Sequence, residues 1–282
     1  MQPRNDTLID LALEEDAAFG DITSQSIFAV DHQSQARILA REDMVVCGLD
    51  IAQRVFKRVD AALEVALETR DGERVRKGST VLVVRGPTIS LLTAERTALN
   101  FLQRLSGIAT LARRFADAAQ KTGTGVRIVD TRKTMPGWRA LEKYAVRCGG
   151  CFNHRSSLGE HVLIKENHIA AAGSLAKAVE MARKFAPHCA KIEVETESLN
   201  DVKEALQAGA EVIMLDNMSP QQIEQAVALI NKAAIVEISG GVRLDTVADY
   251  ALPGVDVISV GALTHSAPAA DFSMIVFSGS SE

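Results

Sequence analysis

The sequence predicts an α/β protein in which a mixed α+β region precedes a region of repeated strand–helix units. Three observations support this prediction. Apolar segments of strand length recur in the second half of the chain, most of them about 20 to 28 residues apart, and segments with helical periodicity separate them. Before about residue 110, short strand-like segments follow one another with glycines between them. Alternating strands and helices indicate βαβ units and parallel pairing.

The first region is expected to be a mixed α+β domain. Its predicted elements, in chain order, are a helix over 7–15, a turn over 19–23, strands over 35–39, 44–46, 63–67 and 80–85, and a helix over 90–105. Gly72, Gly78 and Gly86 separate the later strands. Nothing in this region alone indicates a chemistry.

The second region contains the repeated units. Its predicted strands cover residues 126–130, 162–165, 191–195, 212–216, 235–239 and 255–260. Three intervening helices have recognisable starts, because Ser174, Ser198 and the pair Ser219-Pro220 fit the preferences of helix N-termini. The first of these helices is expected to bury one face, formed by Leu175, Ala178, Val179, Ala182 and Phe185. A (β/α) barrel and an open doubly wound sheet both satisfy this pattern, and the visible strands are fewer than the eight of a complete barrel.

Composition excludes several functional classes. The chain has 282 residues, of which 47% are hydrophobic and 24% charged, and its formal net charge is −5. These proportions exclude a disordered chain, and no apolar stretch reaches the roughly 20 residues of a membrane helix. The first residues lack the apolar core of a secretory signal, and four cysteines are too few for a disulfide scaffold, so we expect a cytoplasmic protein. The acidic balance predicts neither nucleic-acid binding nor membrane binding.

Polar residues follow the predicted strands at their carboxyl ends, where α/β enzymes place their active sites. Cationic ends suit carboxylates, acidic ends suit sugar hydroxyls or a divalent metal, and glycines allow backbone amides to approach phosphate. Residues 127–165 hold eight Lys and Arg against three acidic residues, which fits either a solvated basic face or a pocket for an anion. The predicted ligand therefore carries carboxylate, a sugar and phosphate. The strand ends, in order, are Arg132-Lys133, Lys165, Glu195, Asp216, Ser239-Gly240-Gly241 and Gly261.

Motifs throughout the chain resemble those of the quinolinate phosphoribosyltransferases, also called carboxylating nicotinate-nucleotide pyrophosphorylases. They keep the family's order and lie at residues 15–23, 95–110, 130–139, 143–155, 163–169, 192–195, 213–217, 238–241 and 258–265. The resemblance implies a mixed α/β N-terminal domain over 1–110, rejoined by 266–282, and an open α/β barrel of fewer than eight strands over 111–265. It also implies a homodimer with shared active sites, and it leaves assembly beyond the dimer open.

The resemblance implies a reaction in NAD biosynthesis. Phosphoribosyl pyrophosphate and quinolinate give nicotinate mononucleotide, pyrophosphate and CO2, with Mg²⁺ and without an organic cofactor. By motif position, Lys133, Glu195 and Asp216 are the expected catalytic residues, and Glu195 and Asp216 are also expected to hold Mg²⁺, directly or through water. The expected substrate-binding residues are Arg96 from the partner subunit, Arg132, Lys133, His154, Arg155, Lys165, Glu195, Asp216, Ser239, Gly240, Gly241, Val260 and Gly261.

Within that set the resemblance implies distinct tasks. Arg132, Arg155 and Lys165 would hold the quinolinate carboxylates, and Lys133 and His154 would face pyrophosphate or carboxylate groups. The acidic pair would meet the ribose hydroxyls. The 5′-phosphate would lie among the serine, the glycines and the valine at the last two strand ends, Ser239, Gly240, Gly241, Val260 and Gly261.

Three other functions compete with this one. A paralogous phosphoribosyltransferase, of the type associated with molybdenum uptake, would act on another anionic acceptor. An aldolase would form a Schiff base on Lys165, and an anion-binding module would bind without turnover. The complete set of Arg96, Arg132, Arg155 and Lys165 favours a dicarboxylate over the paralogue's acceptor.

A few residues remain outside these assignments. Met135, Cys151 and Phe152 differ from the family's usual residues, and Cys151 and Phe152 are expected to narrow the mouth of the pocket. Cys148 and Cys151 have the spacing of a redox or metal pair, but without a second pair they are interpreted as ordinary thiols. The sequence leaves the roles of Arg104 and His168 open.

Overall fold

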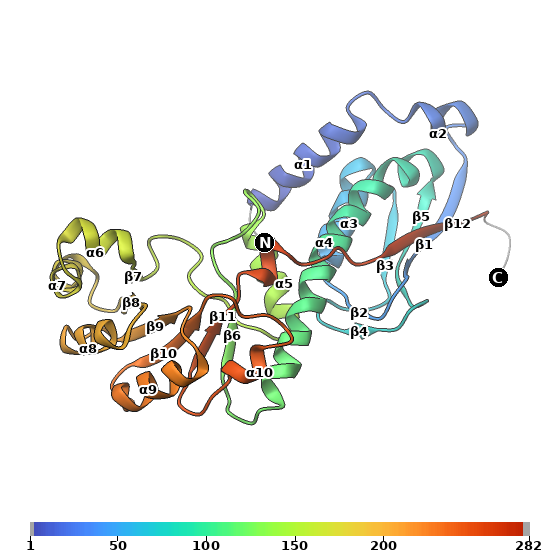
Figure 1. Ribbon diagram of the computed structural model, residues 1–282. Helices are drawn as coiled ribbons and strands as arrows, with labels where there is room; N and C mark the ends of the chain where they lie inside the picture. Colours follow the sequence, from blue (N-terminus) through green and yellow to red (C-terminus); the bar gives the residue numbers. More distant parts are fainter. Residues whose placement is uncertain (1–2, 279–282) are drawn as a thin grey trace. The chain divides into compact units, whose positions relative to one another are not determined.

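The computed structural model of the protein describes residues 3–278 and shows two compact units (Figure 1). The first unit contains the chain up to residue 112, residues 136–150 and the segment from residue 267. The second contains residues 113–135 and 151–266. The last four residues of the predicted returning tail, 279–282, lie outside the described residues.

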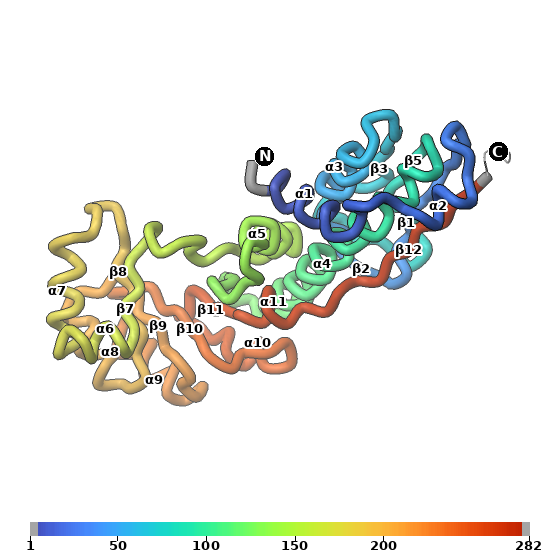
Figure 2. Tube along the Cα trace, turned by 90° about the horizontal axis from the view of Figure 1, so that it is seen from above, coloured from blue at the N-terminus to red at the C-terminus, as the bar shows by residue number. Residues whose placement is uncertain are grey.

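An antiparallel sheet forms the centre of the first unit. Its strand order is β12 (Phe272–Ser278), β1 (Gln33–Ala40), β5 (Thr80–Pro87) and β3 (Glu64–Leu67). Figure 2 shows β12, in red, running beside β1, with which it pairs from Ser34 to Ala40. A short antiparallel pair, β2 (Met44–Val45) and β4 (Arg74–Val75), accompanies the sheet. Burial alternates along β1, as expected for a strand with one face in the core.

Helices cover the apolar side chains of this unit. They are α1 (Pro3–Ala17), α2 (Ile22–Ile27), α3 (Leu49–Val59), α4 (Thr88–Gln120) and α5 (Arg139–Cys148). The prediction ended the fourth helix near residue 105, but α4 continues to Gln120, so the boundary between the two units falls within it. A Cβ atom on Gly107 would lie 1.9 Å from the Pro268 carbonyl oxygen, so only glycine allows the returning chain to touch α4 here.

Residues 136–150 pack with the first unit, whereas the sequence analysis placed them in the catalytic domain of residues 111–265. The Trp138 ring stacks on Phe101 with 4.8 Å between ring centroids. Arg104 donates to the buried Glu142 carboxylate on α5, with 2.5 Å between Nη2 and Oε1. Arg104, whose role the sequence left open, therefore holds α5 against α4.

A parallel sheet forms the centre of the second unit. All six predicted strands are confirmed, and the sheet order is β6 (Arg127–Val129), β11 (Val257–Ser259), β10 (Ile235–Ser239), β9 (Val212–Asp216), β8 (Ile192–Thr196) and β7 (Val162–Ile164). In the described chain this is an open, barrel-like α/β arrangement with fewer than eight strands, as predicted. The strands are mostly buried along their length, as parallel strands between other layers require, but β8 and β10 each bury a glutamate among their apolar side chains.

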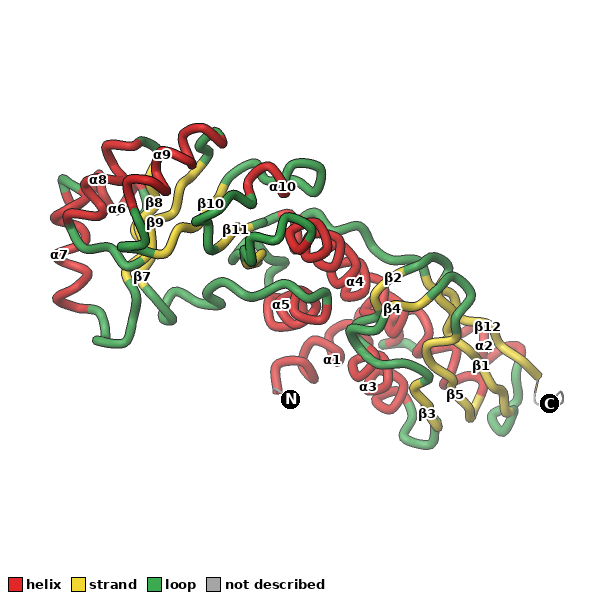
Figure 3. Tube along the Cα trace, turned by 90° about the horizontal axis from the view of Figure 1, so that it is seen from below, coloured by secondary structure: helices red, strands yellow, loops and turns green. Residues whose placement is uncertain are grey.

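Helices follow most of these strands. They are α6 (Glu166–Ala172), α7 (Leu175–Phe185), α8 (Leu199–Gln207), α9 (Pro220–Ile230), α10 (Val247–Tyr250) and α11 (Ala262–His265). Figure 3 shows α7, α8 and α9 in red along the yellow strands. Ser174, Ser198 and Ser219 cap their helices as predicted. The predicted burial of Phe185 is wrong: it lies at the end of α7 with 93% of its surface exposed. Among residues 3–278, no helix is both long and apolar enough to cross a membrane.

Candidate active site

A cavity of about 300 Å³ lies at the carboxyl ends of the parallel strands in the second unit. Six of the residues predicted for the site line it: Arg132, Lys133, His154, Arg155, Lys165 and Ser239. The other lining residues are Thr131, Leu163, Met214, Glu237 and Ser259. Cys151 and Phe152 are not among them, so they do not narrow this cavity as expected. Phe152 instead lies under the Arg127 guanidinium, 5.3 Å from it.

Cationic side chains form one wall of the cavity. Burial lowers the pKa of the Arg155 guanidinium, and the positive charge of Arg132 lowers this pKa further. The Arg155 side chain is oriented by its bond from Nη1 to the His161 carbonyl oxygen, at 3.1 Å. The positive charges of Arg132 and Arg155 repel each other. An anion with two acidic groups relieves this repulsion when it binds, so the pair favours such an anion.

The loop after β6 is also fixed. The Lys133 amide donates to the Thr131 hydroxyl at 3.0 Å, and the Lys133 carbonyl accepts from the Thr264 hydroxyl at 2.7 Å. The Lys133 side chain is exposed. A cation on a fixed backbone is therefore presented at the cavity wall.

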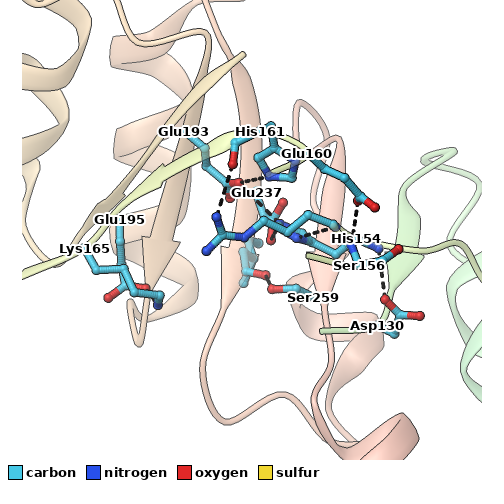
Figure 4. Close-up of polar contacts among 12 residues, drawn as sticks. Asp130, His154, Ser156, Glu160, His161, Lys165, Glu193, Glu195, Glu237 and Ser259 are labelled. Carbon is cyan, nitrogen blue, oxygen red and sulfur yellow. Dashed lines mark hydrogen bonds and ion pairs between the residues drawn. The ribbon is translucent and has the colours of Figure 1, made fainter. Parts of the chain in front are cut away.

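Lys165 and Glu195 form an ion pair at the ends of β7 and β8 (Figure 4). The Lys165 ammonium donates to Glu195 Oε2. The sequence left the role of His168 open, and the structure shows that it supports this arrangement. Its Nδ1 accepts the Lys165 amide at 2.9 Å, which caps α6 and fixes the backbone that carries Lys165.

Two buried glutamates beside the cavity are functional candidates that the sequence analysis missed. Glu193 and Glu237 are only 2% and 3% exposed. His154 Nε2 lies 3.3 Å from Glu193 and 3.4 Å from Glu237, and His161 Nε2 lies 3.1 Å from Glu193. Figure 4 shows this cluster of two acids and two histidines. Its members come from interior positions of β8 and β10 and from the segment before β7, so only their contacts distinguish them from ordinary core residues.

The cluster shifts the titration of its members. Burial raises the pKa of Glu193, but the two histidines outweigh it and lower this pKa to about 2. Burial opposes the charged form of His154, but the two carboxylates outweigh it and raise its pKa to about 9. Burial and the nearby Glu193 charge raise the pKa of Glu237. His154 therefore favours its cationic form beside two acids of which Glu193 is the more strongly ionised.

Both ring nitrogens of His154 are engaged by the protein. Nε2 faces the two glutamates, and Nδ1 accepts the Arg155 amide at 2.9 Å. Full protonation of the ring removes this acceptor, which offsets part of the rise in pKa. The predicted contact of His154 with a substrate anion stays a prediction, because in this geometry the ring links the acids to the Arg155 backbone.

Asp130 anchors the segment that carries His154 and Arg155. Its carboxylate is fully buried and accepts the Asn153 side-chain amide at 2.5 Å and the His154 backbone amide at 3.0 Å. Phe152 forms a parallel bridge with Val129 of β6 just before this point. The end of β6 thus positions both Arg132 and Arg155.

Glu195 and Asp216 lie at the ends of the neighbouring strands β8 and β9. The register places Glu195 opposite Met214, so Asp216 follows two residues further along the same face. Asp216 accepts from the Asn217 side chain at 2.7 Å and does not line the cavity. Mg²⁺ binds to one or two protein carboxylates and completes its shell with water and substrate phosphates, so the residue types are suitable, and the predicted Mg²⁺ site stays a prediction.

The residues predicted to hold the 5′-phosphate lie at the ends of β10 and β11. Gly240 has a φ of +90°, and a Cβ atom there would lie 2.2 Å from Asn217 Oδ1, whereas the space around Gly241 is open. A Cβ on Gly261 would lie 3.1 Å from Lys133 Cδ. The Val260 amide already donates to the Val129 carbonyl at 2.9 Å. The Val260 amide is therefore already bonded within the protein, and the predicted phosphate site at these strand ends stays a prediction.

Arg96 lies in the first unit. It is exposed on α4 and lines a different cavity, of about 280 Å³, together with Phe101, Trp138 and residues of α1. Its predicted contribution to a second subunit's site stays a prediction.

Comparison with known proteins agrees with this arrangement. The family models described as "Quinolinate phosphoribosyl transferase, C-terminal domain" and "N-terminal domain" match residues 108–275 and 21–106. A probable carboxylating nicotinate-nucleotide pyrophosphorylase of Bacillus subtilis is 43% identical, over 93% of this chain and 90% of its own length. A decarboxylating quinolinate phosphoribosyltransferase of Nicotiana tabacum is 41% identical, over 95% of this chain and 81% of its own.

Solved structures show the same fold. The crystal structure of NadC from Streptococcus pyogenes is 42% identical, with a TM-score of 0.94 and 98% of each chain covered. The nicotinate-nucleotide pyrophosphorylase of Francisella tularensis is 39% identical, with a TM-score of 0.93 and the same coverage. The chain described here belongs to the quinolinate phosphoribosyltransferase family.

Proposed function

We propose that this protein transfers the phosphoribosyl group of phosphoribosyl pyrophosphate to the ring nitrogen of quinolinate, with release of pyrophosphate and CO2. The product is nicotinate mononucleotide, a precursor in NAD biosynthesis. Membership of the family supports this proposal. The single observation that carries it is the convergence of Arg132, Arg155 and Lys165 on one cavity beside the Glu195 carboxylate.

The cations recognise the acceptor. Quinolinate has two adjacent carboxylates, and Arg132 and Arg155 offer two guanidiniums whose repulsion a dicarboxylate relieves. Lys165 adds a third cation whose Nζ is held by Glu195. This arrangement orients the ring so that its nitrogen faces the sugar, which converts an encounter in solution into a reaction between positioned atoms.

Acidic side chains stabilise the charge that develops on the sugar. As the bond from the anomeric carbon to pyrophosphate breaks, positive charge appears on the ribose ring, and carboxylates fixed nearby lower its energy. Glu195 and Asp216 are proposed for this role. Lys133 is proposed to balance the negative charge of the leaving pyrophosphate. Mg²⁺ bound near Glu195 and Asp216 would supply further neutralisation of the pyrophosphate oxygens.

The second step needs no acid or base from the protein. Once the ring nitrogen carries the ribose it is cationic, and it accepts the electron pair released when the adjacent carboxylate leaves as CO2. The proton that replaces CO2 on the ring comes from water. The contribution of the chain is to hold the remaining carboxylate, for which Arg155 and Lys165 are the proposed partners, and the 5′-phosphate at Ser239, Gly240, Gly241 and Gly261.

We also propose that the protein is a homodimer and that it is cytoplasmic. Segment 19–30 exposes large apolar side chains, with Phe19 97% and Val30 87% accessible, and such patches are typical of interaction surfaces. If Arg96 serves the partner's site, mixing inactive Arg96→Ala chains with inactive Lys165→Ala chains restores activity, because one pocket of each mixed dimer keeps both residues. Verified mixed dimers that stay inactive would contradict the shared site.

The function is tested by incubating the protein with quinolinate, phosphoribosyl pyrophosphate and Mg²⁺. We expect nicotinate mononucleotide and CO2 in equal amounts. Nicotinic acid, which lacks the second carboxylate, should react poorly. Tight quinolinate binding without product would instead identify an anion-binding protein, and a borohydride-trapped adduct on Lys165 would identify an aldolase.

A further inference from the structure

Two cysteines meet in the first unit, whereas the residues proposed for catalysis belong to the second. Cys47 precedes Gly48, the N-cap of α3, and Cys148 is the last residue of α5. Their sulfur atoms and one carboxylate oxygen of Asp71 all lie within 4.8 Å of one another. Cys47 is fully buried, whereas Cys148 is half-buried. Cys148, whose sequence spacing suggested Cys151 as its partner, thus has Cys47 as its thiol neighbour.

Asp71 has its own partners, which argues against a metal at this cluster. Its Oδ1 accepts the Gly48 and Leu49 amides at 3.0 and 3.1 Å, and its Oδ2 accepts the Tyr144 hydroxyl at 3.0 Å. The carboxylate therefore caps the start of α3 and anchors α5. A metal ion would have to break these bonds and would find only two sulfur ligands beside them, fewer than the four donors of a structural zinc site.

The two thiols differ in reactivity and in access. A hydrogen bond from Cys47 lowers the pKa of the Cys148 thiol, burial opposes this shift, and the Tyr144 hydroxyl lowers the pKa further. The hydrogen bond with Cys148 and burial raise the pKa of Cys47. The accessible sulfur is thus the one that forms a thiolate more readily, and the buried sulfur lies ready to react second.

We propose that Cys47 and Cys148 form an intramolecular disulfide by exchange with a small disulfide such as oxidised glutathione. The Cys148 thiolate attacks one glutathione sulfur, forms a mixed disulfide and releases a glutathione thiolate. Cys47 then gives its proton to that thiolate and attacks the Cys148 sulfur, releasing the second glutathione. Two electrons pass from the cysteine pair to the oxidant, which becomes two reduced glutathione molecules.

This site goes beyond the proposed function and does not depend on it. The bond would join Cys47, which precedes the N-cap of α3, to the last residue of α5. The Arg104–Glu142 pair and the Trp138–Phe101 stack already hold α5 within the first unit. Oxidation would therefore lock α5 in place and would raise the temperature at which the first unit unfolds, because the closed loop restricts the unfolded chain.

The test uses the reduced, full-length protein treated with oxidised glutathione, quenched with acid, alkylated and digested for peptide mass spectrometry. We expect a Cys47–Cys148 linked peptide, with Cys151 and Cys189 alkylated, and an upward shift in melting temperature that dithiothreitol reverses. In the Cys47→Ser variant the reaction should stop at a stable mixed disulfide between glutathione and Cys148. In the Cys148→Ser variant Cys47 should stay reduced. Cys189→Ser, which changes an exposed thiol outside the cluster, should form the bond like the wild type.

The peptide map of the oxidised wild-type protein tests the proposed disulfide even if a variant fails to fold. A link from Cys148 to Cys151 or Cys189, a lasting glutathione adduct on wild-type Cys148, or a reduced pair under conditions that modify Cys189 would each overturn the proposal. So would stoichiometric zinc binding to the reduced protein that protects both thiols and is lost in Cys47→Ser, since that would identify a metal site.

Discussion

The two units of this protein bury acidic side chains in different ways. In the first unit, the fully buried Glu142 carboxylate accepts hydrogen bonds from Arg104 Nε and Nη2, at 3.1 and 2.5 Å. In the second, Glu193 and Glu237 face histidines at 3.1 to 3.4 Å, and among the described residues Oε1 of Glu193 has no hydrogen-bond donor. A protein retains an incompletely satisfied buried charge at a cost, and such charges concentrate at functional sites.

This difference separates a buried charge pair that stabilises the fold from buried acids that lie beside the candidate active site. The Arg104–Glu142 pair joins two helices and holds them together. The acids of the second unit keep a histidine charged beside a cavity whose wall already carries two arginines. Variants that remove charges from each unit therefore test whether this division holds.

The largest effect on stability is expected from Arg104→Ala. It leaves the Glu142 carboxylate buried without its arginine, which typically costs about 3–5 kcal/mol of unfolding free energy. Denaturant unfolding measures the loss. The matched control is Arg76→Ala, which breaks an exposed pair with Asp43 and should cost less than about 1 kcal/mol. Equal losses in the two variants would contradict the structural role of the buried pair.

Removing one arginine from the cavity should affect binding instead. Arg132→Ala or Arg155→Ala deletes a charge-assisted contact of about 1.5–3 kcal/mol, so the KM for quinolinate should rise roughly 10- to 100-fold. Steady-state kinetics measure this change. Arg183→Ala, on the exposed side of α7, serves as the control and should leave KM unchanged. Unaltered KM values in both cavity variants would refute the carboxylate assignment.

The charge on His154 should make stability depend on alkaline pH. Its pKa is raised in the folded protein to about 9 from an ordinary 6.5, so the stabilisation is complete below pH 6.5 and is lost as pH rises through 9. The loss is expected to be roughly 1–3 kcal/mol, since a tenfold change in proton affinity corresponds to about 1.4 kcal/mol. Unfolding curves from pH 6 to 10 measure it. The His154→Gln variant should not show this alkaline loss of unfolding free energy. Identical pH profiles for the two proteins would contradict the assignment of the loss to His154.

The smallest effect is expected from Glu237→Gln. Burial raises the pKa of Glu237, so the ionised form is costly in the folded state, and removing the charge offsets the lost attraction to His154. The unfolding free energy should change by less than about 1 kcal/mol. Glu142→Gln, which removes the carboxylate charge paired with Arg104, should lose clearly more. A larger loss at Glu237 than at Glu142 would reverse the proposed division between the units.

Sequence patterns predicted the second unit's strands well because buried parallel strands are rich in Val, Ile and Leu and end in polar residues. They predicted its capped helices through serines whose hydroxyls accept helical amides. The prediction ended α4 near residue 105, whereas the helix continues through Gly107 to Gln120, although glycine is unfavourable inside helices. The contact of Gly107 with Pro268 explains why glycine is kept within the helix, and such a long-range contact leaves no local signal.

The site was predicted at the strand ends but not within the strands. Glu193 and Glu237 occupy inward positions of β8 and β10, and sequence alone does not distinguish a buried acid with a histidine partner from one facing solvent. Phe185 was expected in the core because it continues the apolar spacing of α7, yet the helix ends there and the ring projects into solvent. Residues 136–150 pack with the first unit through contacts such as Arg104–Glu142, which joins positions 38 residues apart and leaves no local sequence signal.

The pairing of β12 with β1 has a consequence for biosynthesis. β1 emerges from the ribosome early, but its neighbour is synthesised only after the entire second unit. Until then the nascent sheet has an open edge at β1, with unpaired amides and carbonyls that another chain can join. Chaperone dependence during translation should therefore be governed by this strand, and a chain that stops before residue 272 should aggregate through it.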